Sequence, residues 1–496
     1  MNKYSKRNDG VMFSVVLLCI SVSGFNIAHA VTEKGAVAAA LSFNCSADST
    51  WFSSPGLPTE VKQSNGPGDS SFCDFYQFSW QTFAYLMSPS RTNPAVLNFE
   101  DASQYYELEM NEDGTPANSC DDTHDSHVFF IRSTKPRENG TTFLIPERIG
   151  QAGGGSTIYD QNQNVVYYDV RFSKNMCDVN KIKQLQNFPG GTTEIKTAWK
   201  VLGASDDASK FLTIDATITP DKKDIPNTKT TKLGMIGFHV AVATSNHPEF
   251  VWATFEHKVN APDCTSPTST SGWSFASQAC TTDLQNKDPL GIVQCRFNNP
   301  LPSTQISGTP TEICREYAYG SAAGDLKYDE NTQDIMTLNA DVQQYLTGDY
   351  KVLTNYFNVG ALWVSDISDS SAIGNQRGSL RLANTVAETE YQDVDLTADF
   401  VSNCFGCHNY AGSAKNINNT TSNSLSHIFD DIAIGSGQCL DIQAANTINT
   451  QQQANLACPK VCTKSSRQLS WNGQWTNQSA STGRQLPMTV CGCCGN

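Results

Sequence analysis

Cysteines constrain the fold of this 496-residue chain more than any other feature. Seventeen are present, of which Cys19 lies in an apolar N-terminal stretch, while Cys404 and Cys407 belong to the pentapeptide CFGCH at 404–408. The other fourteen divide around this pentapeptide, eight before it and six after it. An even number of cysteines in an exported chain is typical of disulfide bonds. We therefore expect two separately cross-linked units, one on each side of CFGCH.

The first thirty residues have the order of a secretory signal peptide. Basic residues precede an apolar run from Val11 to about Ile20, and small residues lie before a cleavage point after Ala30. This run is shorter than the roughly 20 residues that a bilayer-spanning helix needs. We expect residues 1–30 to be removed and the mature protein to be periplasmic or secreted, with no membrane span.

The charge balance argues against one class of partner. The chain holds 49 acidic and 34 basic residues, which gives a formal net charge of −15. A surface of this sign repels the phosphates of nucleic acids and of anionic lipids. We therefore expect no nucleic-acid partner.

Short β-branched and aromatic segments dominate the middle of the chain and predict strands. They lie at 127–132, 164–173, 194–202, 235–244 and 249–259. Apolar residues at three- and four-residue spacings predict a helix over 75–87, and 325–346 and 376–403 are expected to be helical too. Residues 411–438 shift to Asn, Ser, Thr and Gly, which indicates a domain boundary. The prediction is an α+β fold, with a sheet-rich body over 31–436 and a small disulfide-linked, β-rich domain over 437–496.

The pentapeptide CFGCH has the spacing of a c-type haem attachment site. On one helical turn, Cys404 and Cys407 can bond the haem vinyl carbons while His408 ligates the iron. A redox disulfide and half of a zinc site are the alternatives, but neither predicts the adjacent histidine. We expect one covalent haem c. Only about 30 residues separate His408 from the cysteine-rich tail, so the haem must pack against the preceding body.

The second axial ligand of the iron is left open by the sequence. His427 is the leading candidate, because it lies 19 residues after His408 between apolar neighbours. An ordinary, partly buried histidine is the alternative interpretation. Four residues are weaker candidates: His239, His257, Met235 and Met336. A vacant or water-bound position would allow catalysis.

The body resembles a family of exported bacterial monohaem proteins of the cytochrome c type. The resemblance covers roughly residues 70–410 and rests on the segments 194–202, 236–264, 382–392 and 403–408. It implies haem and export but names no substrate. Polar residues embedded in these apolar segments are Glu194, Lys196, Glu256 and His257. They either line a catalytic cleft or form a buried network of ion pairs and hydrogen bonds.

The tail contains the segment WNGQWT at 471–476, in which aromatic rings and amides suit a carbohydrate site. Together with the residues before it and MTVCGC at 488–493, it resembles the mannan-binding lectin family. The resemblance implies a glycan-contacting loop made by Asn472, Gly473, Gln474, Trp475 and Thr476.

A second contact segment of that family reads approximately GPxWxN. The corresponding stretch here is NTINTQ at 446–451, with Asn449 where the tryptophan is expected. We expect short strands around a Trp-rich loop, held by up to three disulfides. Six cysteines allow fifteen pairings, and the sequence does not choose among them.

These features predict an exported monohaem c-type cytochrome that transfers single electrons and is directed to mannose-containing glycan by its tail. The redox partner protein is not indicated. Two alternatives remain. One is a peroxidase- or oxygenase-like haem enzyme with an open distal site, and the other is an adhesive carbohydrate-binding protein.

Overall fold

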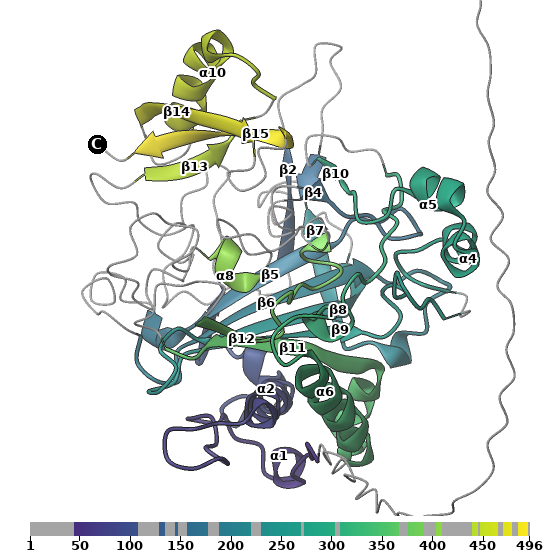
Figure 1. Ribbon diagram of the computed structural model, residues 1–496, viewed down its shortest axis with the longest axis vertical. Helices are drawn as coiled ribbons and strands as arrows, with labels where there is room; N and C mark the ends of the chain where they lie inside the picture. Colours follow the sequence, from purple (N-terminus) through teal and green to yellow (C-terminus); the bar gives the residue numbers. More distant parts are fainter. Residues whose placement is uncertain are drawn as a thin grey trace, which may run out of the picture. The chain divides into compact units, whose positions relative to one another are not determined.

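A computed structural model gives the structure of the chain (Figure 1). It describes residues 44–107, 128–133, 144–146, 156–176, 188–219, 230–268, 272–302, 308–366, 375–389, 392, 403–408, 439–444, 447–464, 470–478 and 485–494. The body is here the part up to residue 408, and the tail module is the part from 439 to 494. The expected signal peptide, the boundary segment 411–438 and His427 lie outside the described residues.

The body is built on a ten-stranded sheet in which all pairs are antiparallel except β2 with β7. Its main path runs β1-β5-β6-β8-β7-β2-β3, and β9, β11 and β12 extend from β8. The strands are β1 (Tyr105–Glu107), β2 (Val128–Ser133), β3 (Leu144–Pro146), β5 (Tyr167–Ser173), β6 (Thr193–Val201), β7 (Thr213–Thr219), β8 (Thr230–Val242), β9 (Val251–His257), β11 (Tyr356–Val364) and β12 (Gln376–Gly378). All five predicted strands are confirmed. A separate pair joins β4 (Ser156–Thr157) to β10 (Leu301–Pro302).

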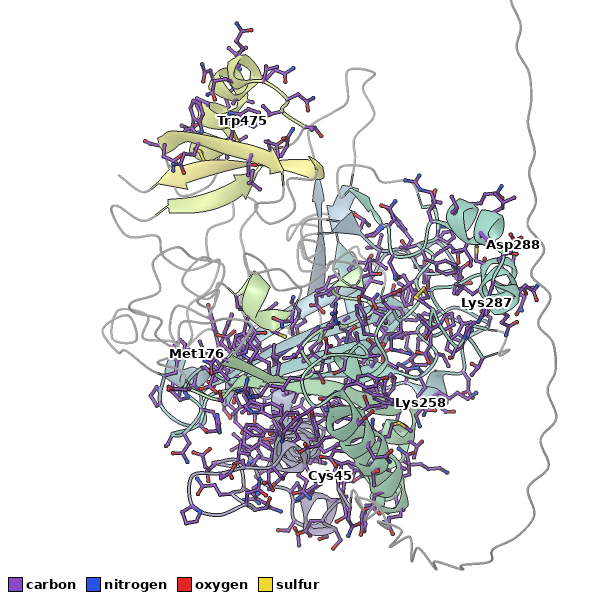
Figure 2. All side chains as sticks on the ribbon, viewed as in Figure 1. Cys45, Met176, Lys258, Lys287, Asp288 and Trp475 are labelled. Carbon is purple, nitrogen blue, oxygen red and sulfur yellow. A yellow bond between two sulfur atoms is a disulfide. The ribbon has the colours of Figure 1, made fainter. Side chains whose placement is uncertain are left out.

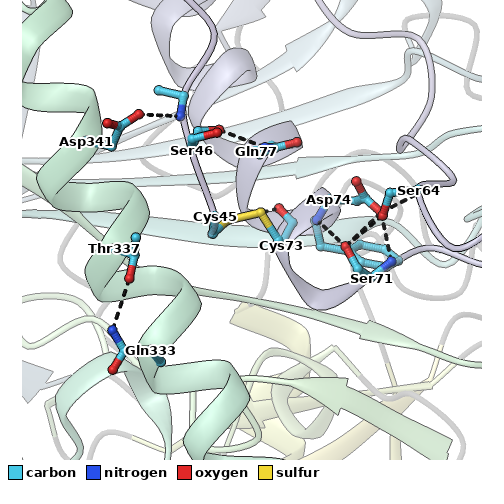
Figure 3. The surroundings of a disulfide bond; sticks show 12 residues. Cys45, Ser46, Ser64, Ser71, Cys73, Asp74, Gln77, Gln333, Thr337 and Asp341 are labelled. Carbon is cyan, nitrogen blue, oxygen red and sulfur yellow. Dashed lines mark hydrogen bonds between the residues drawn. A yellow bond between two sulfur atoms is a disulfide. The ribbon is translucent and has the colours of Figure 1, made fainter. Parts of the chain in front are cut away.

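Helices cover one face of this sheet. Helix α2 (Phe72–Leu86) starts at a capping box between Ser71 and Asp74 and confirms the helix predicted over 75–87. Its aromatic rings stack on the strands, with Phe83 4.0 Å from Phe255 between ring centroids. Helix α6 (Tyr328–Val342) lies beside α2 and confirms the helical prediction for that region. Figure 3 shows how the Cys45–Cys73 disulfide fastens the chain before α1 to α2.

The other helices among the described residues of the body are short. They are α1 (Thr50–Ser53), α4 (Gln278–Asn286), α5 (Pro289–Cys295), α8 (Cys404–Cys407) and the 3-10 helices Asn98–Glu100, Lys174–Met176, Ala208–Lys210, Ala318–Gly320, Gln343–Tyr345 and Gly348–Asn355. Helix α8 lies on the face of the sheet opposite α2 and α6 (Figure 1). No described helix is long and apolar enough to cross a membrane.

The helix expected over 376–403 is wrong for the residues described there. Gln376–Gly378 forms strand β12, which pairs with β11, and turns follow it. Gly378 has a φ of +89°, and a Cβ at this position would lie 2.3 Å from the Ala361 carbonyl oxygen. Asn384 uses its side chain to bind Thr254 and the Phe255 carbonyl of β9. Polar contacts to distant strands therefore replace the hydrogen bonds that a helix would make.

The tail module contains three antiparallel strands in the order β13-β15-β14, with one helix. They are β13 (Cys439–Gln443), α10 (Gln451–Lys464), β14 (Ser470–Gln478) and β15 (Gln485–Cys494). Helix α10 was not predicted. It packs through Ala454, Cys458 and Cys462, which are fully buried and recur at every fourth residue.

Disulfides join cysteines within each part of the chain. The body holds Cys45–Cys73, Cys264–Cys314 and Cys280–Cys295, and the tail module holds Cys458–Cys491 and Cys462–Cys493. None of these five bonds crosses from one part to the other, which agrees with the expected separate cross-linking. Cys120 and Cys177 lie outside the described residues.

Candidate functional site

The segment NGQWT is a bulge in strand β14 rather than an open loop. The register of β14 against β15 shifts between Trp471 and Trp475. Gly473 has a φ of +87°, which a residue with a side chain rarely adopts. The Trp471 indole N–H donates to the Gln474 carbonyl at 2.8 Å, and the Gln474 N–H donates to the Asn472 side chain at 2.9 Å. These bonds hold the bulge with its polar side chains outward.

Trp475 is half-buried, whereas Asn472, Gly473, Gln474 and Thr476 are exposed. Figure 2 labels Trp475 in the tail module. Its indole Nε1–H donates to Oε1 of Gln451 at 2.8 Å. A ligand therefore meets this side chain through the ring rather than through the N–H.

A second segment lies next to the bulge. Asn477 follows the NGQWT residues, and its buried side chain donates to the Ile448 carbonyl at 2.7 Å and to Oδ1 of Asn449 at 3.1 Å. Asn449 is exposed, so the position expected to carry a tryptophan borders the bulge as an amide. The structure thus brings together the two segments that the resemblance singled out. It adds Asn477, which sequence reasoning missed, and gives Gln451, the last residue of 446–451, a contact with Trp475.

The chemistry of this surface is uncharged. Its side chains are the partly exposed rings of Trp471 and Trp475, several amides and the hydroxyl of Thr476. Ring faces attract the C–H faces of sugars, and amides donate to and accept from hydroxyl groups. The arrangement suits a neutral saccharide.

The pentapeptide CFGCH forms the helical turn α8 on the body. Asn403 begins the turn, since its side chain accepts from the Phe405 N–H at 3.1 Å and donates to the Leu380 carbonyl at 2.8 Å. The His408 N–H donates to the Cys404 carbonyl at 2.8 Å, so the turn extends to the histidine. Cys404, Cys407 and His408 therefore share one turn, and this order of residues fits haem c, in which two cysteines would form thioethers with the vinyl groups and the histidine would ligate the iron.

The body holds this turn through aromatic contacts. Phe405 is fully buried in an apolar cluster of the sheet. The partly exposed His408 ring lies 4.4 Å from the ring of Trp252 on β9, at an interplanar angle of 53°. The Trp252 indole N–H in turn donates to the Glu249 carbonyl at 3.1 Å. The motif is thus packed against the preceding body.

His257 is not available as a distal ligand. Its ring is fully buried, and Nε2 lies 2.9 Å from the Lys210 carbonyl, to which it donates. Nδ1 accepts from the Val259 N–H at 3.3 Å, so both nitrogens are used. Burial of the ring lowers the pKa of His257 to about 4.

The other described candidates for the distal iron ligand lie on different faces of the sheet. Met235 is buried on the face that α2 covers, and Met336 is exposed on α6, so neither lies on the face that carries α8. His239 does face that side, because it is a register partner of Thr254, two residues from Trp252 on the same strand. Its Nε2 lies 3.2 Å from Oε1 of Glu388.

Of the four embedded polar residues, Glu256 lies in a buried network of an ion pair and hydrogen bonds. This fully buried carboxylate lies 2.7 Å from the Arg315 guanidinium and accepts from both the N–H and the hydroxyl of Thr385. Glu194 is buried on β6. Lys196 is partly exposed, with its Nζ 3.8 Å from Glu388.

Comparison with known proteins gives one match. A family model described as "MVL: Mannan-binding protein" matches residues 451–493, which span α10, β14 and most of β15. The tail module is therefore similar to mannan-binding proteins. No curated protein and no solved structure matches the chain.

Proposed function

We propose that this exported protein binds mannose-containing glycan through the bulge of its tail module. The observation that carries the proposal is the position of Trp475 and its neighbouring amides beside Asn449, within a segment similar to mannan-binding proteins. Five disulfides among the described residues support export.

The bulge binds a sugar with two kinds of contact. The ring of Trp475 stacks on the C–H face of a mannose unit, and the amides of Asn472 and Gln474 hydrogen-bond to its hydroxyl groups. Asn449 offers no second ring. The loss of that stacking weakens binding by on the order of 1–3 kcal/mol, with stacking of bases on aromatic rings as the guide.

Retention of the secreted protein on immobilised mannan tests this proposal. Trp475→Ala should abolish retention, and Gln474→Ala should weaken it. Leu456→Ala is the matched control, because Leu456 is 71% exposed on α10 and does not belong to the bulge. A folded wild-type protein that passes through mannan and oligomannoside columns unretained would refute the proposal.

We also propose that the body transfers single electrons through a covalent haem c. Helix α8 and the packing of His408 on Trp252 support this second function. Cys404 and Cys407 would hold the haem and His408 would ligate its iron, and the bound haem supplies reversible one-electron chemistry. Trp252 then orients the imidazole, while buried Phe405 keeps water from the base of the turn. The tail would keep this body at a glycan surface by tethering.

Acid-acetone extraction tests the haem, since thioether bonds retain it and coordination alone does not. Retention should be lost in the double variant Cys404→Ala, Cys407→Ala. Free haem in the extract, or none in the purified protein, would refute this function. Reaction of the reduced protein with carbon monoxide would instead favour an enzyme with an open site. A shift toward a high-spin spectrum in His427→Ala would identify the distal ligand.

A further inference from the structure

The ring of Trp475 is held by a pair of amides on helix α10. Oε1 of Gln451 accepts from the indole N–H at 2.8 Å, and Nε2 of Gln451 donates to Oδ1 of Asn455 at 2.8 Å. Gln451 and Asn455 are four residues apart, so they lie on the same face of the helix. The result is a relay of two hydrogen bonds from the helix to the ring.

The start of α10 is itself fixed against the strands. The Thr450 hydroxyl accepts from the Gln453 N–H at 3.2 Å, which caps the helix directly before Gln451. The Cys458–Cys491 disulfide joins the same helix to β15, and Cys491 is the register partner of Trp475. Gln451 therefore approaches the ring from a rigid support.

We propose that Gln451 is a positioning residue for glycan binding, which sets the orientation of the Trp475 ring without touching the sugar. This inference rests on the proposed glycan function. A half-buried indole without a hydrogen-bond anchor can still sample more than one rotamer, and ligand binding must then select the one that stacks. The relay removes this cost before the ligand arrives. It also explains how a site without the ring expected at 449 can still present a defined stacking surface.

A substitution that removes only the acceptor tests the role. Gln451→Met keeps length and helix propensity but cannot accept from the indole, so it should weaken mannan binding roughly two- to tenfold, as for one modest hydrogen bond. Gln451→Glu keeps an acceptor oxygen and should bind nearly as tightly as wild type. Gln452→Ala is the matched control, because Gln452 is the next exposed residue of the helix.

A double-mutant cycle separates positioning from direct contact. Trp475→Phe removes the indole N–H but keeps a ring, so in this background Gln451→Met should have no further effect on the dissociation constant. The measurement uses the full-length secreted protein, with thermal unfolding to verify the fold. If Gln451→Met weakens binding equally in both backgrounds, Gln451 contacts the sugar and the positioning role is wrong. If Gln451→Met binds like wild type, the relay is irrelevant. In either case, retention of the wild-type protein on mannan would still support the proposed glycan function. Failure of the wild-type protein to bind mannan would refute both the glycan function and the role of Gln451.

Discussion

The buried ring of His257 makes the stability of the body depend on pH in a calculable way. Its pKa falls from an ordinary value of 6.5 to about 4, because burial disfavours the charged ring. Between these values the unfolded chain binds a proton that the folded protein excludes. The free energy of unfolding must therefore decrease as the pH falls from 6.5 to 4. With about 1.4 kcal/mol for each pKa unit, the full decrease is about 3 kcal/mol.

The variant His257→Gln isolates this contribution. A glutamine can still donate to the Lys210 carbonyl and accept from the Val259 N–H, but it does not titrate. It loses the stacking of the imidazole on Phe211, whose ring centroid lies 4.2 Å away, so we expect a cost of about 1–2 kcal/mol at pH 7. Urea unfolding of both proteins at several pH values gives the difference in stability, in which the other histidines cancel.

The wild-type protein starts about 1–2 kcal/mol more stable at pH 7 but alone loses about 3 kcal/mol by pH 4, so the two stability curves should cross at about pH 5–6, and the variant should be the more stable below the crossing. Parallel curves between pH 6.5 and 4 would show that His257 is protonated in the folded state at its ordinary pKa. The hydrogen-bond assignment of the ring would then be wrong, and with it the exclusion of His257 as an iron ligand.

Four further predictions follow from other sites. Burial, and to a smaller extent the charge of Glu330, raises the pKa of Asp334 to about 6, so the stability of the wild-type protein declines as the pH rises from about 4 to 6. The free energy of unfolding of Asp334→Asn at pH 8 should therefore exceed that of the wild type by about 1–2 kcal/mol. Reduction of the tail disulfides should abolish mannan retention while an oxidised control keeps it, because so small a core needs its cross-links. Asn449→Trp should tighten mannan binding by up to about 1–3 kcal/mol, less about 1 kcal/mol for the lost bond from Asn477; weaker binding would place the sugar elsewhere. Deletion of 437–496 should remove mannan retention and leave the haem spectrum unchanged; loss of the spectrum would contradict the separate cross-linking of the two parts.

Local sequence patterns predicted the strands and the helix that bury many apolar residues of their own segment. The strands β5, β6, β8 and β9 were predicted from short runs of β-branched and aromatic residues, and helix α2 from apolar residues at three- and four-residue spacings. Helix α10 has a helical spacing of buried residues, but the face that it buries is only weakly apolar. Its buried positions are an alanine and two cysteines, and Pro459 lies inside it, so the helix was visible only once its disulfides to β15 were known.

The segment after β12 shows the opposite error. Its composition favours a helix, but the side chains of Asn384 and Thr385 bind residues of β9 about 130 positions earlier in the chain. Such bonds compensate for the hydrogen bonds of a helix that does not form. A prediction from local sequence cannot include these hydrogen bonds, because their partners lie about 130 residues away.

Both candidate sites combine a recognisable motif with a supporting residue elsewhere in the chain. This arrangement limits what the sequence alone can predict about the sites. Each places its reactive or binding groups on a short segment that can be recognised in the sequence, the helical turn CFGCH in one case and the strand bulge NGQWT in the other. Each motif is held from behind by one distant residue, Trp252 beneath His408 and Gln451 beside Trp475. Trp252 lies within the segment 236–264 and Gln451 ends the segment 446–451, but neither segment indicates which ring its residue supports. Substitutions in the motifs should therefore abolish function outright, whereas substitutions of the supports should weaken it by degrees, because they change how often the correct orientation is populated.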